Sequence, residues 1–293
     1  MRTNRVIFGK LILLVLLGVF CAPGFETQAQ VRTNLPRDIT IGSIPDMGVA
    51  ETRKKMEPLA KYFQAQTGIP VKISVPSSYS KLMAAMVIGQ VDFAYMGPSN
   101  YVEAHRLAGV EAVLIELSPE GKPGYYSVLI TSKKSGIKNL DKARGKNFAF
   151  THPDSTSGFL MPNIYFAQER KEPLSSFASK TEMAGSHLDV VQGVYKGKYD
   201  VGATSDMDLA KAAASLKIKP SQFVILWKSE LIPGAPFVAR KGVKPEVKDL
   251  FIDTLVGVGN DKALIKEMQI GGYTPAKDSD YDVIRDLEQY LKK

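Results

Sequence analysis

Cysteine is almost absent from this chain of 293 residues, since its only thiol, Cys21, lies close to the N-terminus. One cysteine cannot form a disulfide within the chain or build a cysteine-rich zinc site. If the N-terminal segment is removed on export, thiol catalysis is excluded as well. A lipoprotein anchor at Cys21 remains an alternative, although Phe20 precedes it where a small residue is expected.

Long apolar runs are also scarce, and one continuous run at residues 11–22 stands out. Positive charges precede it, ending at Lys10, and small and polar residues follow as far as Ala29. This order of charged, apolar and small-residue regions is typical of a secretory signal peptide. We therefore predict a signal peptide at residues 1–29, cleaved near Ala29, and a periplasmic mature chain. The run is shorter than the roughly 20 residues of a membrane span, so no membrane insertion is expected, with a signal anchor as the alternative.

Blocks of like charge are missing, although the formal net charge at pH 7 is +8. Lysine and arginine are spread along the chain rather than gathered in a run. Because an exported protein rarely meets nucleic acid, we expect no nucleic-acid partner. A modest positive field suits an anionic solute.

Common catalytic motifs are missing as well. The sequence has no Gly-x-Ser-x-Gly, no His-Glu-x-x-His, no Gly-x-x-x-x-Gly-Lys and no Gly-x-Gly-x-x-Gly. No group of residues has the spacing of metal ligands. We therefore expect no enzyme activity, no cofactor and no metal. An enzyme whose catalytic residues form no such motif is the alternative.

Apolar residues instead form strand-like and helix-like segments that alternate along the mature chain. The predicted strands are 38–44, 71–75, 91–95, 110–117, 125–130, 148–150, 200–204 and 223–227. The predicted helices include residues 56–63, 79–89, 98–109, 158–168, 187–195, 206–214, 247–255 and 284–291. This alternation predicts an α/β fold with mainly parallel sheets covered on both faces.

The alternation breaks and restarts near residue 131, and the strand 223–227 can cross back. We therefore predict one lobe from residues 38–130 and 228–293 and a second lobe from residues 131–227. Ligands of open α/β sheets bind outside the carboxyl ends of the strands, and two lobes on a hinge can close around a solute. The cleft between the lobes is the expected site.

A segment rich in hydroxyls, Ser155-Thr156-Ser157, lies between a predicted strand and a predicted helix, with Gly158 after it. The start of a helix presents backbone N–H groups and a positive dipole end to an anion. Hydroxyls add donors without adding charge. An ordinary helix cap is equally compatible with the spacing.

Three further side chains are candidates for contacts with an anion. His187 precedes a predicted helix and can donate from a ring nitrogen. Tyr79 and Tyr125 follow breaks in the pattern, and a phenol donates one hydrogen bond while its ring covers apolar substituents. A structural histidine and ordinary core packing are the alternatives.

Two carboxylates, Asp206 and Asp208, follow the predicted strand 200–204. A carboxylate that faces an anion is unfavourable unless the ligand carries a proton or an amine. Phosphate, phosphite and phosphonates can carry such a proton at neutral pH, whereas sulfate does not. A buried aspartate here would therefore select protonated oxyanions. Asp206 is the candidate, the choice between it and Asp208 stays open, and a surface helix cap is the alternative.

Together these segments resemble the periplasmic phosphate/phosphite/phosphonate-binding proteins of ABC importers, in order and over nearly the whole mature chain. The matching stretches are Tyr79-Ser-Lys-Leu-Met-Ala-Ala-Met, Val91-Asp-Phe-Ala-Tyr-Met-Gly-Pro, Gly124-Tyr-Tyr-Ser-Val-Leu-Ile, Ser155-Thr-Ser-Gly-Phe-Leu-Met-Pro, Ala184-Gly-Ser-His and Trp227-Lys-Ser-Glu-Leu-Ile-Pro-Gly.

The resemblance implies a two-lobe periplasmic-binding-protein fold of type II, with two mixed or mainly parallel sheets and a ligand cleft between the lobes. It also implies that the phosphorus oxygens are held by the hydroxyl-rich helix start, the histidine and the tyrosines. Carried onto this chain, those ligand-binding residues are Ser155, Thr156, Ser157, His187, Tyr79 and Tyr125.

One departure from the family concerns amine-bearing ligands. Relatives that bind aminoalkylphosphonates have an acidic residue inside Ile-Pro-Gly-x-Pro, where this chain has Ala235, and a second acidic position falls near Met207. The resemblance therefore favours phosphite, phosphate or a small alkylphosphonate. We expect a monomeric extracytoplasmic solute-binding protein that delivers this ligand to an ABC transporter permease. The alternative is a periplasmic oxyanion sensor that partners a membrane histidine kinase.

Overall fold

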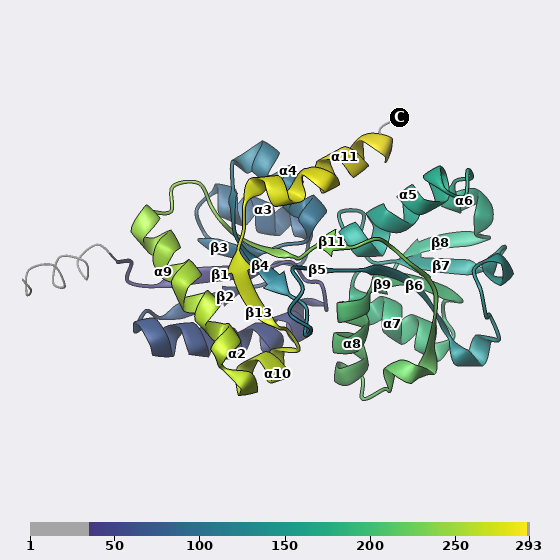
Figure 1. The fold of residues 1–293 in the computed structure, drawn as a ribbon, viewed down its shortest axis with the longest axis horizontal. Coiled ribbons are helices and arrows are strands. Elements are labelled where there is room, and N and C mark those ends of the chain that lie inside the picture. The colour runs from purple at the N-terminus through teal and green to yellow at the C-terminus, as the bar shows by residue number, and fades with distance from the viewer. Residues whose placement is uncertain (1–34, 292–293) are drawn as a thin grey trace, which may run out of the picture. The chain divides into compact units, whose positions relative to one another are not determined.

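The computed structural model describes residues 35–291, so the predicted signal peptide and Cys21 lie outside the described part of the chain. No helix in that part is both long enough and apolar enough to cross a membrane. Its elements form an α/β fold of two lobes, each with a mixed sheet and helices on both faces (Figure 1).

The first lobe is built on a six-stranded sheet of order β13-β4-β12-β3-β1-β2. Its strands are β1 (Ile39–Ser43), β2 (Val71–Ser74), β3 (Phe93–Tyr95), β4 (Glu111–Leu117), β12 (Pro236–Ala239) and β13 (Gly272–Pro275). Strand β1 is parallel to β2 and β3, whereas β12 and β13 run antiparallel to β4. The helices of this lobe are α2 (Val49–Thr67), α3 (Tyr79–Val87), α4 (Pro98–Ala108), α9 (Pro245–Val256), α10 (Lys262–Met268) and α11 (Asp282–Leu291). Helices α3, α4 and α11 lie on one face of the sheet, and α2, α9 and α10 lie on the other (Figure 1).

The second lobe is built on a five-stranded sheet of order β10-β6-β9-β7-β8. Its strands are β6 (Ser127–Ser132), β7 (Asn147–Phe150), β8 (Lys180–Met183), β9 (Val201–Ser205) and β10 (Phe223–Lys228). Strand β7 is parallel to β8 and β9, whereas β6 is antiparallel to β9 and β10. The helices of this lobe are η3 (Thr156–Leu160), α5 (Met161–Gln168), α6 (Leu174–Phe177), α7 (His187–Lys196) and α8 (Asp206–Ser215).

A short two-stranded ribbon lies where the chain passes between the two sheets. Strand β5 (Gly124–Tyr125) follows β4 and leads into β6, and β11 (Ile232–Pro233) leads from β10 back to β12. The two strands pair antiparallel, with Tyr125 opposite Ile232. The lobe boundaries expected from the sequence stay a prediction, and this ribbon is the hinge that we propose between the lobes.

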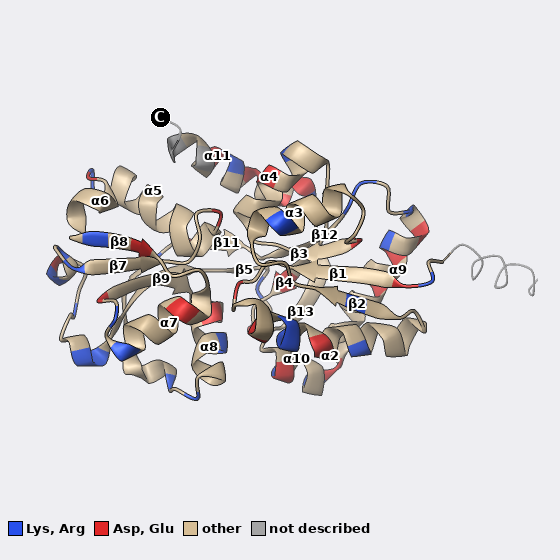
Figure 2. Cartoon of the chain, turned by 180° about the vertical axis from the view of Figure 1, so that it is seen from behind, with Lys and Arg blue, Asp and Glu red and all other residues tan. Residues whose placement is uncertain are grey.

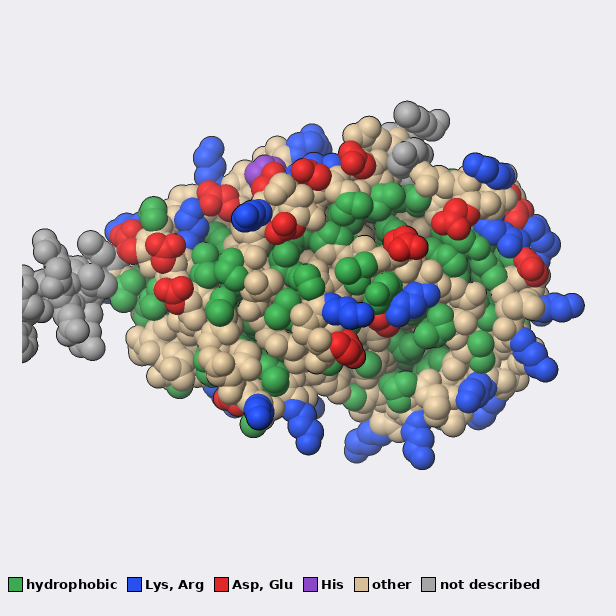
Figure 3. Space-filling view, viewed as in Figure 1, with side chains coloured by type: hydrophobic (Ala, Val, Ile, Leu, Met, Phe, Trp, Pro, Cys, Tyr) green, Lys and Arg blue, Asp and Glu red, His purple; other side chains and the backbone are tan. Residues whose placement is uncertain are grey.

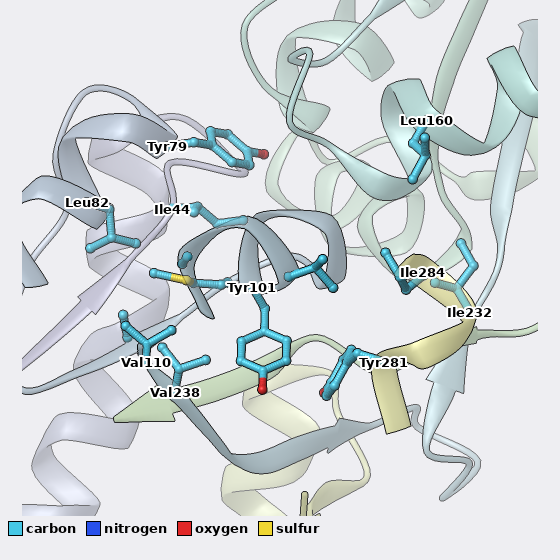
Figure 4. Packing of buried hydrophobic residues seen from close by; sticks show 14 of the residues in the cluster. Ile44, Tyr79, Leu82, Tyr101, Val110, Leu160, Ile232, Val238, Tyr281 and Ile284 are labelled. Carbon is cyan, nitrogen blue, oxygen red and sulfur yellow. The ribbon is translucent and has the colours of Figure 1, made fainter. Parts of the chain in front are cut away.

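Buried apolar side chains join helices and sheet within the first lobe. In Figure 4, Tyr101 and Tyr281 face each other, and their ring centroids are 4.8 Å apart with planes at 65°. The Tyr281 hydroxyl donates to the carbonyl oxygen of Gly234 at 3.0 Å, which fixes the chain next to Ala235. The same cluster includes Leu160 of the second lobe, so the two lobes pack against each other along this edge.

The strands and helices predicted from periodicity are confirmed, although α2 begins at Val49 and ends at Thr67, well outside the predicted range 56–63. The pattern does not predict β12, because Pro233 and Pro236 interrupt its apolar residues. Pro236 is the first residue of β12, a position where the missing N–H group is tolerated. The antiparallel strand β12 is one reason why the first sheet is mixed.

Charged side chains of both signs are distributed over both lobes (Figure 2). On the face shown in Figure 3, basic side chains are prominent along the rim of the second lobe. This arrangement agrees with the spread of lysine and arginine along the sequence.

Candidate ligand-binding site

The helix start after β7 is one wall of the candidate site. Helix η3, a single π-helical turn, continues without a break into α5, and the Oγ atom of Ser155 caps it by accepting from the N–H of Gly158 at 3.0 Å. A Cβ atom at Gly158 would lie 2.0 Å from Oγ1 of Thr151, so only glycine fits this close approach. The first N–H groups of a helix lack partners within the helix and carry its positive dipole end. This turn can therefore hold an anion.

The hydroxyls of this turn are buried where the two lobes meet. Oγ1 of Thr156 accepts from the backbone N–H of Ser99 at 2.9 Å and donates to the Oγ atom of Ser99 at 3.0 Å. Ser99 lies in the first turn of α4, so Thr156 links the two lobes. The carbonyl oxygen of Ser157 accepts from the Oγ atom of Ser127 at 2.7 Å, which leaves the Ser157 side chain to line the pocket.

His187 begins α7 and is only 4% exposed. Its Nδ1 atom lies 2.8 Å from Oγ1 of Thr204, and its Nε2 atom lies 3.5 Å from Oδ2 of Asp208. Its backbone N–H donates to the carbonyl oxygen of Asp46 at 2.7 Å, a hydrogen bond between the lobes. Ring and backbone are therefore held in one position at the pocket.

Asp208, and not Asp206, lies beside His187. Oδ1 of Asp206 accepts from the backbone N–H groups of Tyr126 and Met207, both at 3.0 Å, and its Oδ2 atom lies 3.5 Å from Nζ of Lys228. The Asp206 side chain is 31% exposed and lies outside the pocket lining. The carboxylate of the sequence candidate Asp206 thus fixes the backbone of Tyr126, the residue that follows β5, and does not face the pocket.

Tyr79 and Tyr125 are both buried, at 1% and 8% exposure. Burial, followed by the nearby carboxylates of Asp46 and Asp208, raises the pKa of Tyr79, and burial likewise raises the pKa of Tyr125. Both phenols therefore stay neutral and can donate a hydrogen bond. Tyr79 stacks on His152 with ring centroids 4.4 Å apart, and its hydroxyl points away from its own helix in Figure 4.

The structure adds four residues that the sequence did not single out: Asp46, Tyr95, Glu116 and Lys211. Nζ of Lys211 lies 2.9 Å from Oε1 of Glu116, and these side chains are only 10% and 7% exposed. Two of these residues lie where ligands of such sheets bind, because Asp46 follows the first strand and Glu116 lies near the end of the fourth. Nothing in the sequence pattern pairs Glu116 with a lysine 95 positions away.

The electrostatic setting differs for the two aspartates of the pocket. Burial raises the pKa of Asp46, and the neighbouring Asp208 raises it further. Burial alone would raise the pKa of Asp208 too, but His187 and Lys211 outweigh it and lower that pKa. The pocket therefore contains one carboxyl group that stays ionised easily and one that gains a proton easily.

Most of these groups, but neither Tyr79 nor Asp206, line one pocket between the lobes. It is lined by Ile44, Asp46, Tyr95, Gly97, Glu116, Tyr125, Ser157, His187, Ser205, Met207, Asp208, Lys211 and Ala235. Of the residues expected from the sequence, Tyr125, Ser157 and His187 line it directly. Thr156 and Ser155 lie in the turn behind Ser157. Across residues 35–291, no group of three acidic, histidine or cysteine side chains is arranged to hold a metal ion.

Comparison with known proteins places the whole fold in one family. A family model described as "ABC transporter, phosphonate, periplasmic substrate-binding protein" matches residues 41–281, a span that contains every residue of the pocket. The Phosphate-import protein PhnD of Mycolicibacterium smegmatis is 28% identical over 307 residues, covering 97% of this chain and 95% of that protein. The Phosphonates-binding periplasmic protein of Escherichia coli is 28% identical over 256 residues, covering 85% of this chain and 75% of that protein.

A solved structure agrees with these relatives. The crystal structure of a binding protein component of an ABC phosphonate transporter from Pseudomonas aeruginosa superposes with a TM-score of 0.80 at 27% identity. The match covers 88% of this chain and 87% of that chain.

Proposed function

Because the chain belongs to the family of periplasmic substrate-binding proteins of phosphonate ABC transporters, we propose that its pocket captures a small phosphorus oxyanion for import. The ligand lies between the helix start of η3 and the first lobe, and the lobes close over it. The protein acts by capture and release, without turnover of the ligand.

The observation that carries this proposal is the convergence of donors around one buried pocket. The helix start with Ser157, the ring of His187 and the phenol of Tyr125 all line it. Hydrogen bonds to a charged partner contribute roughly 1.5–3 kcal/mol each. Several of them, less the cost of closure, reach the roughly −8 kcal/mol that a micromolar Kd requires.

The pocket composition bears on the ligand class. Ala235 lines the pocket at the position where, by the resemblance, relatives that bind aminoalkylphosphonates carry an acidic residue, and Met207 and Asp208 line it near the second such position. Phosphite, phosphate or a small alkylphosphonate is therefore the proposed ligand. The relatives described above are named for phosphate import, phosphonate binding and phosphonate transport, and none of these names supports the alternative of a sensor.

The proposed partner is the permease of an ABC importer in the membrane, and the proposed state of the protein is a periplasmic monomer. Donors that are mostly neutral hold an anion without a strong ion pair, which keeps release to a permease fast. No catalytic or nucleic-acid-binding activity is proposed.

The proposal is tested by calorimetry with phosphate, phosphite, methylphosphonate, aminoethylphosphonate and sulfate on the mature protein. We expect at least one phosphorus oxyanion to bind with micromolar affinity, and His187→Ala and Thr156→Ala each to weaken it at least tenfold. His105→Ala is the matched control, since this histidine lies on α4 with a side chain 40% exposed and away from the pocket. Unchanged affinity in both site variants would remove the site assignment, and binding of none of these anions would remove the function.

A further inference from the structure

We propose that Asp46 selects the ligand by the hydrogen that the ligand carries: one acidic oxygen of the bound oxyanion shares its hydrogen with the Asp46 carboxylate, so that a fully deprotonated anion such as sulfate is rejected. This inference rests on the proposed function and names the residue that determines specificity. It concerns a side chain that neither sequence pattern nor resemblance pointed to.

Asp46 is held rigidly at the pocket. Its Oδ1 atom accepts from the backbone N–H of Met47 and from the Oγ1–H of Thr52, both at 2.9 Å. Its carbonyl oxygen accepts from the backbone N–H of His187 at 2.7 Å. Both protein donors use Oδ1, so Oδ2 is the atom of this carboxylate that is left to meet a ligand.

The charges around Asp46 do not neutralise it. Lys211 lies close enough to favour its ionised form but is already paired with Glu116 at 2.9 Å. Across the described residues, no lysine, arginine or histidine nitrogen forms an ion pair with Asp46 within 4.0 Å. Burial raises the pKa of the Asp46 carboxyl group, and the negative charge of Asp208 raises it further. Lys211 and His187 act in the opposite direction.

Several ionisable groups face this carboxyl group from the elements packed around it. From the second lobe they are His187 on α7 and Asp208 and Lys211 on α8. From the first lobe they are Lys55 on α2, Tyr79 on α3, Tyr95 on β3 and Glu116 on β4. The pocket lining therefore carries three carboxyl groups, Asp46, Glu116 and Asp208, against one lysine.

A carboxylate and an oxyanion that meet in such a site need one hydrogen between them, because two like charges at hydrogen-bond distance strongly disfavour ionisation of both. A phosphorus oxyanion with a P–OH group brings this hydrogen. Sulfate does not, so its binding requires Asp46 to take up a proton from solution. Binding linked to the uptake of one proton weakens by up to tenfold for each pH unit above the pKa of that group.

The test uses calorimetry on the mature protein with phosphate, phosphite, methylphosphonate and sulfate between pH 5 and pH 8. The wild-type protein should prefer its best phosphorus oxyanion over sulfate by at least a hundredfold at pH 7, where all three phosphorus ligands still carry a P–OH hydrogen in a substantial fraction of molecules. Asp46→Asn should reduce this preference at least tenfold, since an amide donates a hydrogen to sulfate while its oxygen still accepts from Met47 and Thr52. Asp249→Asn is the matched control, because this exposed aspartate lies on α9 and outside the pocket, and it should leave the preference unchanged.

Two outcomes would overturn the inference. One is an Asp46→Asn protein that keeps the wild-type preference, and the other is a wild-type preference that stays below tenfold at pH 7. The second measurement needs no variant, so a folding defect in Asp46→Asn does not leave the question open. If the wild-type protein binds none of the three phosphorus oxyanions, the proposed function itself fails, which is a different result.

Discussion

Replacing Lys211 by methionine should weaken ligand binding much more than it weakens the fold. Lys211 lies on α8 of the second lobe, and its partner Glu116 lies on β4 of the first. Although burial alone would lower the pKa of Lys211, Glu116 and Asp208 raise it to about 12, so the lysine is charged at neutral pH. The variant leaves Glu116 buried without a cation whenever the lobes are closed, whereas in an open form water can hydrate this carboxylate.

The size of the effect follows from leaving Glu116 buried without its cation. Breaking a buried ion pair by removing one partner costs roughly 3–5 kcal/mol. At about 1.4 kcal/mol for each factor of ten, the Kd should rise by roughly 100-fold to 4,000-fold at pH 7.

The assay is calorimetric titration of Lys211→Met, Lys211→Met/Glu116→Gln and wild-type protein with the best phosphorus oxyanion at pH 7, together with chemical unfolding of the ligand-free proteins. Lys248→Met is the matched control. Its partner Glu111 lies on β4, the strand that also carries Glu116, and Nζ of Lys248 lies 2.7 Å from Oε2 of Glu111. The Glu111 side chain, however, is 55% exposed. Exposed pairs contribute roughly 0–1 kcal/mol, so the control should change the Kd by less than about fivefold.

A Kd within threefold of wild type at pH 7 would refute the reasoning, since it would mean that closure does not bury Glu116. A large loss of affinity that is the same in Lys211→Met and in Lys211→Met/Glu116→Gln would also refute it. In that case the lysine would act on the ligand directly rather than through the charge of Glu116.

Two further predictions concern stability. Gly158→Ala should lower the free energy of unfolding by about 1–3 kcal/mol in urea titrations, because its Cβ atom would lie 2.0 Å from the Oγ1 atom of Thr151; an unchanged midpoint would contradict the close approach. Asp278→Asn should lower the melting temperature at pH 7 but not at about pH 2. Burial alone would raise the pKa of Asp278, but hydrogen bonds from Tyr101 and Arg285 outweigh it and lower that pKa. The carboxylate therefore contributes stability above its unfolded pKa of about 3.9, and this is lost as the pH falls through the lower folded pKa; a melting-temperature difference that persists at pH 2 would contradict this sign.

Local sequence patterns predict most of the fold, because apolar periodicity reports which face of each strand or helix is buried. They fail where a strand is short or is framed by prolines, as at β12. Pairings between strands distant in the chain, such as β12 with β4, leave no local trace. The alternation of strands and helices therefore predicts mainly parallel sheets, whereas both sheets contain antiparallel as well as parallel pairs.

Some residues of the candidate site can likewise be predicted from local sequence, and others cannot. The hydroxyl-rich turn at Ser157 is visible because one local segment makes it. The sequence does not show which of Asp206 and Asp208 faces the pocket. Residues two apart in a helix point to nearly opposite sides, so only one of the two can do so. The pairing of Lys211 with Glu116 depends on how one lobe meets the other.

The ribbon of β5 and β11 ties a pocket residue to the passage between the two sheets. It is narrow, because its register consists of Ile232 opposite Tyr125 and Pro233 opposite Gly124. Tyr125 belongs to this ribbon and also lines the pocket. A change in the angle of this ribbon would therefore move a residue of the pocket, so that opening at the proposed hinge and loss of a ligand contact would occur together.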